Sequence, residues 1–436
     1  MNITASTLSM AWRNLWRNRR RSLVTLGSLA FGFAAVSIFA GYTHASYTVL
    51  ANSAIHAETV GHLTINRNGW VTEGKLHPSR YMLTASEIER VTRIVHDTLP
   101  GTHVIPRMTA SGLLSNGRTS TIFVAVGIHP SDQLILRGPF RDAPGALDPT
   151  RPAGVSLSQG LADILGLRVG DSASVLSSTI HGQANAADVD ITGTVNTGNV
   201  ATNDKLAIMP LDLARELMDA KGRAEVLTLL LPSARAPSTK LDITQQLLLA
   251  YEQKSPGEDE SNAMRNALDA KFKAAGLDMQ VRTWQEMSMF YRQVKTLYDM
   301  IFALMLSVVL AIVVLSIFNA MSMAVVERTR EIGTLRAIGL RRWGVIRLFV
   351  LEAVMLVVVG SLAGLALTGV VRWGVNAADF RYVPPASTLA VPLYIGFDAA
   401  RTAIVALVLA SLAIVAAFLP ARRAARNLII ESLGHV

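Results

Sequence analysis

The chain has 436 residues, no cysteine and a formal net charge of +9, and half of its residues are hydrophobic. The lack of cysteine excludes a disulfide framework, a thiolate metal site and a cysteine nucleophile. The apolar residues are concentrated in four windows, each long enough for a helix to cross a hydrocarbon core of about 30 Å. This pattern excludes a soluble enzyme, a fibrous chain and a disordered chain. The predicted transmembrane helices are 22–43, 300–326, 348–371 and 402–420.

The N-terminal segment, residues 1–21, carries five arginines and no acidic residue. Leu8, Trp12, Leu15 and Trp16 recur at helical spacing, and most of the arginines fall on the opposite face, which predicts an interfacial amphipathic helix. A stop-transfer charge cluster without a formed helix is the alternative. The apolar window that follows is longer than the apolar region of a signal peptide, so we predict that it is retained as the first transmembrane helix.

Charge is distributed unevenly among the segments that flank the four windows. Residues 1–21, 327–347 and 421–436 together carry a net charge of +11, whereas residues 44–299 hold 24 basic and 26 acidic residues. Basic segments stay on the cytoplasmic side of a membrane protein. We therefore expect both termini and the 327–347 loop in the cytoplasm, and the 44–299 insert and the loop 372–401 outside. The basic charge then reflects topology, and we expect no nucleic-acid partner.

The 44–299 insert is long enough for one or two domains with their own cores. Helix signals, such as the capping box of Thr84 and Glu87, alternate with short strand-like runs, which predicts an α+β domain. The polar run 253–262 is expected to be an exposed loop, and helix signals in 263–299 indicate a stiff connection into the second transmembrane helix. Strands are predicted at 103–105, 121–127, 173–176, 189–195 and 227–231, and helices at 85–98, 158–165 and 211–219.

Sequence motifs for catalysis are missing. The chain contains no G-x-x-x-x-G-K-[ST] phosphate loop, no H-E-x-x-H, no G-x-S-x-G and no G-x-G-x-x-G. His56 and His62 are the closest pair of histidines in the insert, but their spacing matches no metal motif, so surface or hydrogen-bonded histidines are expected. We predict no catalytic, cofactor-binding or metal-ligating residue in this chain, and an enzyme is the least favoured function.

The loop between the second and third windows combines charges with regularly spaced apolar residues. Ile332, Leu335 and Ile338 are spaced for one helical face, and Gly333 and Gly339 limit the helix to a short one. A short amphipathic helix of this kind fits a groove on a soluble partner protein. A basic patch that contacts anionic lipid is the alternative, and the pattern alone leaves both open.

Two features stand out inside the third window. Glu352 lies about five residues into it, where an acid is costly unless it is paired or reaches the interface. An ion pair with Arg347 or Arg336 is one interpretation, and a carboxylate that reaches the inner interface is the favoured one. Gly360 and Gly364 form a G-x-x-x-G pattern that allows two helices to approach closely, within one chain or between two.

These residues resemble a known family. The layout is similar to the permease subunits of ATP-binding-cassette (ABC) transporters of the MacB-like, LolC/LolE-like and FtsX-like group, the type VII or mechanotransmission systems. The resemblance rests on ERTREIGTLRAIG (327–339), FVLEA (349–353), PARRAAR (420–426) and AWRNLWRNRRRSLVTLGSLAFG (11–32). The run VSLSQGLADILGLRVGDSASVL (155–176) is a weaker match, and the resemblance covers nearly the whole chain.

The resemblance implies an α-helical membrane protein with four transmembrane helices and a large α+β extracytoplasmic domain inserted between the first and second. It implies an inserted distal lobe at about 154–235 and a second permease chain, in a homodimer or a heterodimer. It also implies a separate cytoplasmic ABC ATPase that binds ATP-Mg, since this chain has no phosphate loop. The residues implied to couple to the ATPase are Glu327, Arg328, Arg330, Glu331, Ile332, Gly333, Leu335, Arg336 and Gly339.

The implied function is that of a permease subunit in a bacterial inner membrane. ATP hydrolysis by the separate ATPase would move the external domain, which would act on a lipoprotein or another hydrophobic substrate at the outer face. The partners implied are the ATPase, the second permease, the lipid bilayer, and a periplasmic adaptor or lipoprotein carrier. The alternatives are efflux of a peptide or antibiotic with an envelope-spanning partner, and FtsX-like regulation of an extracellular enzyme.

Overall fold

The computed structural model describes residues 19–74, 76–140, 144–198, 200–232, 245, 249–251, 253, 255–383 and 390–426. Residues 1–18 of the predicted interfacial helix and residues 427–436 of the predicted tail lie outside the described part of the chain. The chain divides into two compact units. The first lies within Met1–Ala45, Lys295–Phe380 and Leu393–Val436, and the second consists of Ser46–Val294 and Arg381–Pro392.

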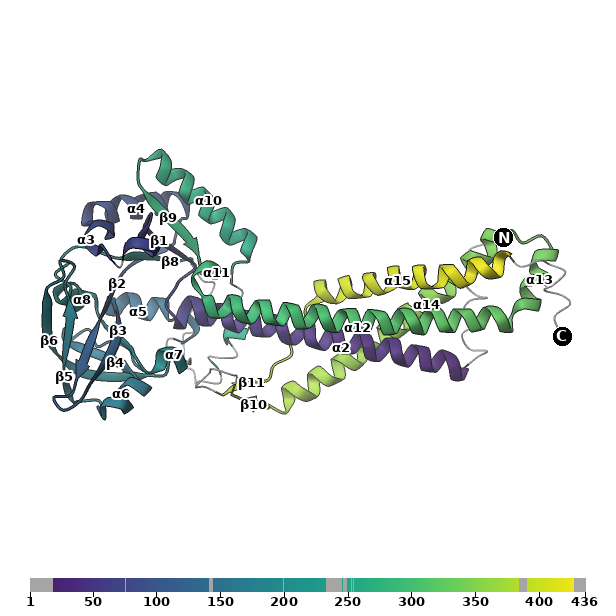
Figure 1. The fold of residues 1–436 in the computed structure, drawn as a ribbon, viewed down its shortest axis with the longest axis horizontal. Coiled ribbons are helices and arrows are strands. Elements are labelled where there is room, and N and C mark those ends of the chain that lie inside the picture. The colour runs from purple at the N-terminus through teal and green to yellow at the C-terminus, as the bar shows by residue number, and fades with distance from the viewer. Residues whose placement is uncertain are drawn as a thin grey trace. The chain divides into compact units, whose positions relative to one another are not determined.

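Four helices of the described residues are long and apolar enough to cross a membrane, as predicted. They extend beyond the predicted windows because the flanking residues continue the helical pattern; the second, for example, begins at Met289 rather than at 300. The fourth continues past Pro420 into the predicted cytoplasmic tail. The helices are α2 (Arg19–Asn52), α12 (Met289–Glu327), α14 (Arg342–Ala377) and α15 (Ala399–Arg426) (Figure 1).

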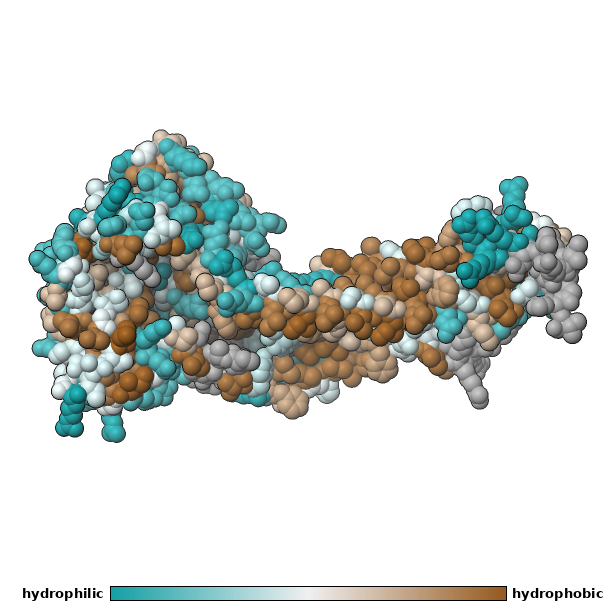
Figure 2. Space-filling model, viewed as in Figure 1, coloured by the Kyte–Doolittle hydropathy of each residue, from teal (hydrophilic) through white to brown (hydrophobic). Residues whose placement is uncertain are grey.

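Within the first unit the four long helices share one apolar core. Leu29 and Phe33 of α2, Val313 of α12, Phe349 of α14 and Leu409 of α15 are buried in it. The outward faces of the same helices are also apolar, and Figure 2 shows this hydrophobic surface along α12. Such a surface would be unstable in water but is what a lipid bilayer covers. The exposed apolar side chains include Leu304, Val308, Leu315, Val370, Leu407 and Val415.

The second unit is built on a nine-stranded sheet in the order β3-β7-β4-β6-β5-β2-β8-β1-β9, in which β3 also pairs with β2. This additional pairing closes β2, β3, β7, β4, β6 and β5 into a barrel. The strands are β1 (Leu63–Arg67), β2 (His103–Ser115), β3 (Ser120–Ile128), β4 (Gly154–Ser158), β5 (Ser172–Ser178), β6 (Ala184–Val195), β7 (Leu206–Pro210), β8 (Val226–Leu230) and β9 (Met279–Thr283).

The long strand β2 belongs to both parts of this sheet. Its first residues, from His103 to Arg107, pair with β8, and its last eight residues, from Met108 to Ser115, pair with β3. Strands β8, β1 and β9 therefore continue from β2 as a four-stranded sheet outside the barrel. Phe123, Leu157 and Met209 belong to the core that the barrel strands share with α6 (Gln159–Leu165) and α8 (Leu211–Leu217).

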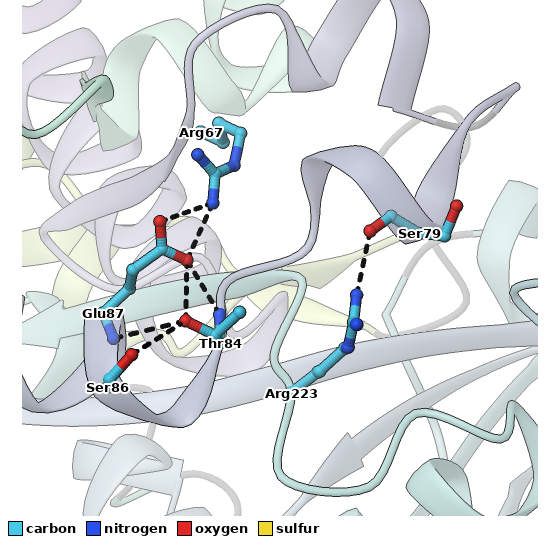
Figure 3. A network of polar contacts seen from close by, with 6 residues as sticks. All are labelled: Arg67, Ser79, Thr84, Ser86, Glu87 and Arg223. Carbon is cyan, nitrogen blue, oxygen red and sulfur yellow. Dashed lines mark hydrogen bonds and ion pairs between the residues drawn. The ribbon is translucent and has the colours of Figure 1, made fainter.

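Helices α4 (Ala85–Thr98) and α10 (Glu258–Ala274) pack on the four-stranded sheet through a separate core. The capping box predicted for α4 is confirmed: the Thr84 hydroxyl accepts a hydrogen bond from the Glu87 amide, and the Glu87 carboxylate accepts one from the Thr84 amide at 2.9 Å. Arg67 donates to both Glu87 oxygens, at 2.6 and 2.7 Å, which ties β1 to the start of α4 (Figure 3).

Two expectations for the insert differ from the structure. The predicted loop 253–262 is helical from Glu258, because three acidic residues occupy the first turn of α10, where the helix dipole favours negative charge. The helix expected over 263–299 is interrupted by β9 and the short α11 (Trp284–Met287). The remaining short elements are α3 (Pro78–Tyr81), α5 (Pro130–Leu136), α7 (Val200–Asn203), η1 (Ser53–Ala57), η2 (Trp70–Gly74), η3 (Gly138–Phe140), β10 (Arg381–Tyr382) and β11 (Val391–Pro392).

The closed barrel does not coincide with residues 154–235, the predicted distal lobe, whose limits stay a prediction. The barrel includes β2 and β3, which precede residue 154, and β8 pairs with β1 and β2 in the four-stranded sheet instead of joining the barrel. Residues 233–235 lie outside the described part of the chain. The difference arises because barrel closure depends on the pairing of β5 with β2 and of β7 with β3 and β4, and these strands are far apart in the sequence.

Candidate functional site

The charged loop between α12 and α14 forms one short helix, α13 (Thr329–Ala337). Helix α12 ends at Glu327, and Arg328 leaves the helical conformation, with φ −110° and ψ 18°, as the N-cap of α13. At the other end Gly339 has φ +107°, a left-handed conformation that favours glycine. Its amide donates to the Arg336 carbonyl at 3.1 Å and the Leu340 amide donates to the Leu335 carbonyl at 3.0 Å, which is a Schellman motif.

The residues predicted to couple to an ATPase fall on different sides of this helix. Ile332 and Gly333 are buried, and Ile332 packs in the core of the four long helices. Leu335 and Arg336 are half-buried. The inner face of α13 is therefore fixed to its own chain, while its charged face points to the surface. The exposed members of the predicted set are Glu327, Arg330, Glu331 and Gly339.

The segment that joins α13 to α14 carries an exposed apolar surface. Ile338 is 80% exposed, Trp343 64% and Leu340 37%, and we call these three the apolar turn. The Leu340 side chain lies over Gly344, since a Cβ atom built on that glycine would be 2.7 Å from Leu340 Cδ1. The sequence pattern placed Ile338 on the same helical face as Ile332, but Ile338 is exposed whereas Ile332 is buried. An exposed apolar surface bordered by arginines is typical of a site that contacts another protein.

Glu352 forms a buried ion pair with Arg328. Arg328 Nη1 donates to Glu352 Oε2 at 3.0 Å and to Oε1 at 3.3 Å, and the two residues are 8% and 4% exposed. The expected partners, Arg347 and Arg336, are corrected to Arg328, and the favoured interpretation of a carboxylate at the interface is corrected to an interhelical contact. No signal in the sequence indicates this pair, because it forms only where the non-helical residue after α12 packs against α14.

The glycines of the G-x-x-x-G pattern lie against α2 of the same chain. A Cβ atom at Gly360 would be 2.7 Å from Leu29 Cβ, and one at Gly364 would be 2.7 Å from the Ala30 carbonyl oxygen. Gly32 of α2 lies equally close to α12, with its Cβ position 3.0 Å from Val309 Cγ1. Close approach of the long helices within one chain therefore accounts for these small residues.

The histidine pair of the second unit is buried. His56 Nδ1 donates to the Leu136 carbonyl at 2.8 Å, and His62 Nδ1 accepts a hydrogen bond from the Leu231 amide at 3.2 Å. The two ring centroids are 6.1 Å apart. Burial, together with the neighbouring His56, lowers the pKa of His62 to about 3. The described residues contain no group of three or more His, Cys, Asp or Glu side chains able to hold a metal ion.

Comparison with protein-family models gives two matches. Residues 22–246, more than half of the chain, match the MacB-like periplasmic core domain. Residues 303–428 match the FtsX-like permease C-terminal domain. The second match includes α13, the apolar turn and Glu352.

Individual relatives are similar over the whole chain. The lipoprotein-releasing system transmembrane protein LolC of Neisseria meningitidis serogroup B is 23% identical, over 95% of this chain and 94% of its own length. The pyoverdine export ATP-binding/permease protein PvdT of Pseudomonas entomophila is 24% identical, over 96% of this chain but 58% of its own length. The solved periplasmic region of MacB from Actinobacillus actinomycetemcomitans is 14% identical and covers 52% of this chain and 89% of that one, with a TM-score of 0.31.

Proposed function

The chain belongs to the MacB-like and FtsX-like family of type VII ABC-transporter permeases, and from this premise we propose that it is a permease subunit driven by a separate cytoplasmic ATPase. The observation that carries the proposal is α13 with the apolar turn. The helix is fixed to its own chain through Ile332, and it leaves Ile338, Leu340 and Trp343 uncovered by the described residues. A groove on the ATPase would receive these three side chains.

The long helices support a mechanical role for this contact. Helix α12 is one uninterrupted helix from Met289 to Glu327, so a displacement of its cytoplasmic end is not absorbed by a break along its length. Closure of an ATPase dimer on ATP would move α13, and α12 and α2 would pass the movement to the external domain. ATP-Mg would be bound by the partner alone, since this chain has no phosphate loop.

The substrate we propose is a lipoprotein or another hydrophobic molecule at the outer face of the inner membrane. The basis is the similarity to LolC, which extends over 94% of that protein. Efflux of a small product is the second candidate, because the similarity to PvdT extends over 96% of this chain. The chain spans about three-fifths of the length of PvdT, so the similarity to PvdT supports a shared activity less strongly than the similarity to LolC does. A second permease chain, identical or related, would complete the transporter.

The first experiment is purification of the tagged chain from its native membrane in mild detergent, followed by identification of the bound proteins. We expect a stoichiometric ABC ATPase. Trp343→Ala should abolish its recovery, whereas Trp373→Ala, at the opposite end of α14 and 76% exposed, is the matched control and should retain it. If the wild-type chain binds no ATPase in several detergents, the permease proposal is wrong. Equal recovery with both variants would instead contradict only the docking role of the apolar turn.

A further inference from the structure

Helix α13 is bounded by a non-helical joint at each end. The helical conformation is interrupted at Arg328, after α12, and the backbone turns at Gly339, before α14. The contacts that hold the helix to its own chain include those of the buried Ile332 and the ion pair of Arg328 with Glu352. The ion pair connects the first joint directly to α14, 24 residues further along the chain.

This ion pair is better suited to fixing a geometry than to adding stability. Removing two charges from water costs much of what their attraction returns, so a buried pair is a weak source of net stability. A charge-assisted hydrogen bond between two buried side chains, however, restricts how the two can lie relative to each other. Arg328 Nη1 lies within 3.3 Å of both Glu352 oxygens, and both side chains are almost fully buried. The ion pair therefore fixes the direction of α13, which begins after Arg328, relative to α14.

We propose that Arg328 and Glu352 form a positioning pair, which makes α13 and α14 move together when an ATPase displaces α13. Without the pair, the joint at Arg328 would absorb part of the displacement. The inference deepens the proposed function and rests on it, because it concerns how a bound ATPase acts on the membrane helices. It assigns a role in coupling to Glu352, an acid that the sequence pattern placed at the interface.

The test has one readout that needs no ATPase. The chain has no cysteine, so Thr334→Cys gives a single spin-label site on the exposed face of α13. In lipid nanodiscs, Glu352→Gln should increase the mobility of this label. Asp299→Asn is the control, because it neutralises the acid of an exposed ion pair with Lys295 on α12, and it should leave the label unchanged.

The second readout is ATP turnover with saturating ATPase. Glu352→Gln should lower the stimulated kcat about tenfold, within the range of about 5- to 150-fold typical of coupling between sites, while the KM for ATP and the recovery of bound ATPase stay the same. The exchanged pair Arg328→Glu with Glu352→Arg should recover most of the turnover. A merely structural role would instead lower turnover and ATPase recovery in parallel, and that result would overturn the proposal.

A further variant covers the case in which Glu352→Gln does not fold. Arg328→Met combined with Glu352→Leu leaves no unpaired charge in the interior, so we expect it to insert and fold. Its turnover should stay low because the directional contact is lost, and wild-type turnover in this variant would overturn the inference. Absence of ATPase binding by the wild-type chain would contradict the proposed function, whereas normal binding and turnover in Glu352→Gln would contradict the positioning pair alone.

Discussion

At the scale of single residues, His62 makes the second unit sensitive to acid. Its Nδ1 accepts the Leu231 amide proton and so must remain unprotonated, and burial lowers its pKa from the ordinary 6.5 to about 3. The unfolded chain takes up the proton below pH 6.5 but the folded chain does not. The stabilisation is therefore complete above pH 6.5 and is lost progressively as the pH falls from there toward 3.

This gives a measurable pH dependence. Between pH 6.5 and 4 the wild-type chain should lose a few kcal/mol of unfolding free energy through His62, at about 1.4 kcal/mol for each unit by which the two pKa values differ. His62→Asn keeps an acceptor but does not titrate, so its melting temperature should fall less steeply over this range. Thermal unfolding of the full chain, followed by tryptophan fluorescence, measures the difference. His181→Asn, at an exposed histidine, should follow the wild type; parallel slopes in all three would contradict the assignment.

Single residues also show which local interactions the sequence could predict. Thr84 and Glu87 are three positions apart, and their reciprocal hydrogen bonds follow from the helix start alone. Arg328 and Glu352 are far apart in sequence, and the same loop contains Arg336 and Arg347 as alternative partners for Glu352. Only the packing of the break against α14 selects Arg328, so the pair could not be predicted from spacing.

At the scale of elements, the contact of α14 with α2 depends on the absence of a side chain. Gly364→Ala would place a methyl group 2.7 Å from the Ala30 carbonyl and 3.0 Å from Phe33 Cβ. We expect it to lower the unfolding free energy by about 1–3 kcal/mol, as overpacking does. Gly369→Ala, five positions along the same helix, is the control because its Cβ position has no atom within 4 Å. Helix propensity alone would stabilise both variants, because alanine is the better helix former. Thermal unfolding in detergent compares the two, and a melting temperature that changes equally in both variants would contradict the role of the α2 contact.

The charges of α13 allow its two sequence interpretations to be separated. Exchanging Glu331→Arg with Arg336→Glu keeps the net charge of the loop, so binding to anionic vesicles should change little. A docking surface for a protein depends on where each charge lies, and we expect ATPase stimulation to fall about tenfold in the exchanged variant. Vesicle co-sedimentation and ATP turnover give the two readouts. Normal turnover together with unchanged vesicle binding would contradict the docking interpretation and favour the lipid one.

Elements with a clear period were predictable, whereas of the short buried strands β8 was predicted, at 227–231, and β4 and β7 were not. The predicted helix 85–98 is confirmed as α4, and the predicted strand at 121–127 lies within β3. Strands β4 and β7 were not predicted, because they are five residues long and almost continuously buried, which removes the alternation that marks a strand. Only three residues of β2 were predicted as a strand. Its first part pairs with β8 in the four-stranded sheet and its second part pairs with β3 in the barrel, so no single pattern runs along its length.

At the scale of the whole molecule, the membrane constraint made the four long helices predictable, because a bilayer core requires about 20 apolar residues in a row. The barrel of the second unit was not predictable. Its closure requires β5 to pair with β2, and β7 to pair with both β3 and β4. No local pattern encodes such pairings. The fold class is confirmed, while the limits of the distal lobe stay a prediction.

The orientation of the chain in the membrane is predicted from charge and can be measured directly. The basic segments predict that α13 lies in the cytoplasm, and the near-neutral insert predicts that the barrel lies outside. Because the chain has no cysteine, Ile122→Cys on β3 and Ile338→Cys in the apolar turn are each the sole thiol, at well-exposed positions. In spheroplasts, a membrane-impermeant maleimide should label Ile122→Cys at once and Ile338→Cys only after the membrane is dissolved in denaturing detergent. Leu407→Cys, on the apolar face of α15, should resist labelling until that step as well. The reverse pattern for the first two positions would put α13 on the outer side, where no ATP is available, and would therefore contradict both the topology and the coupling mechanism that depends on it.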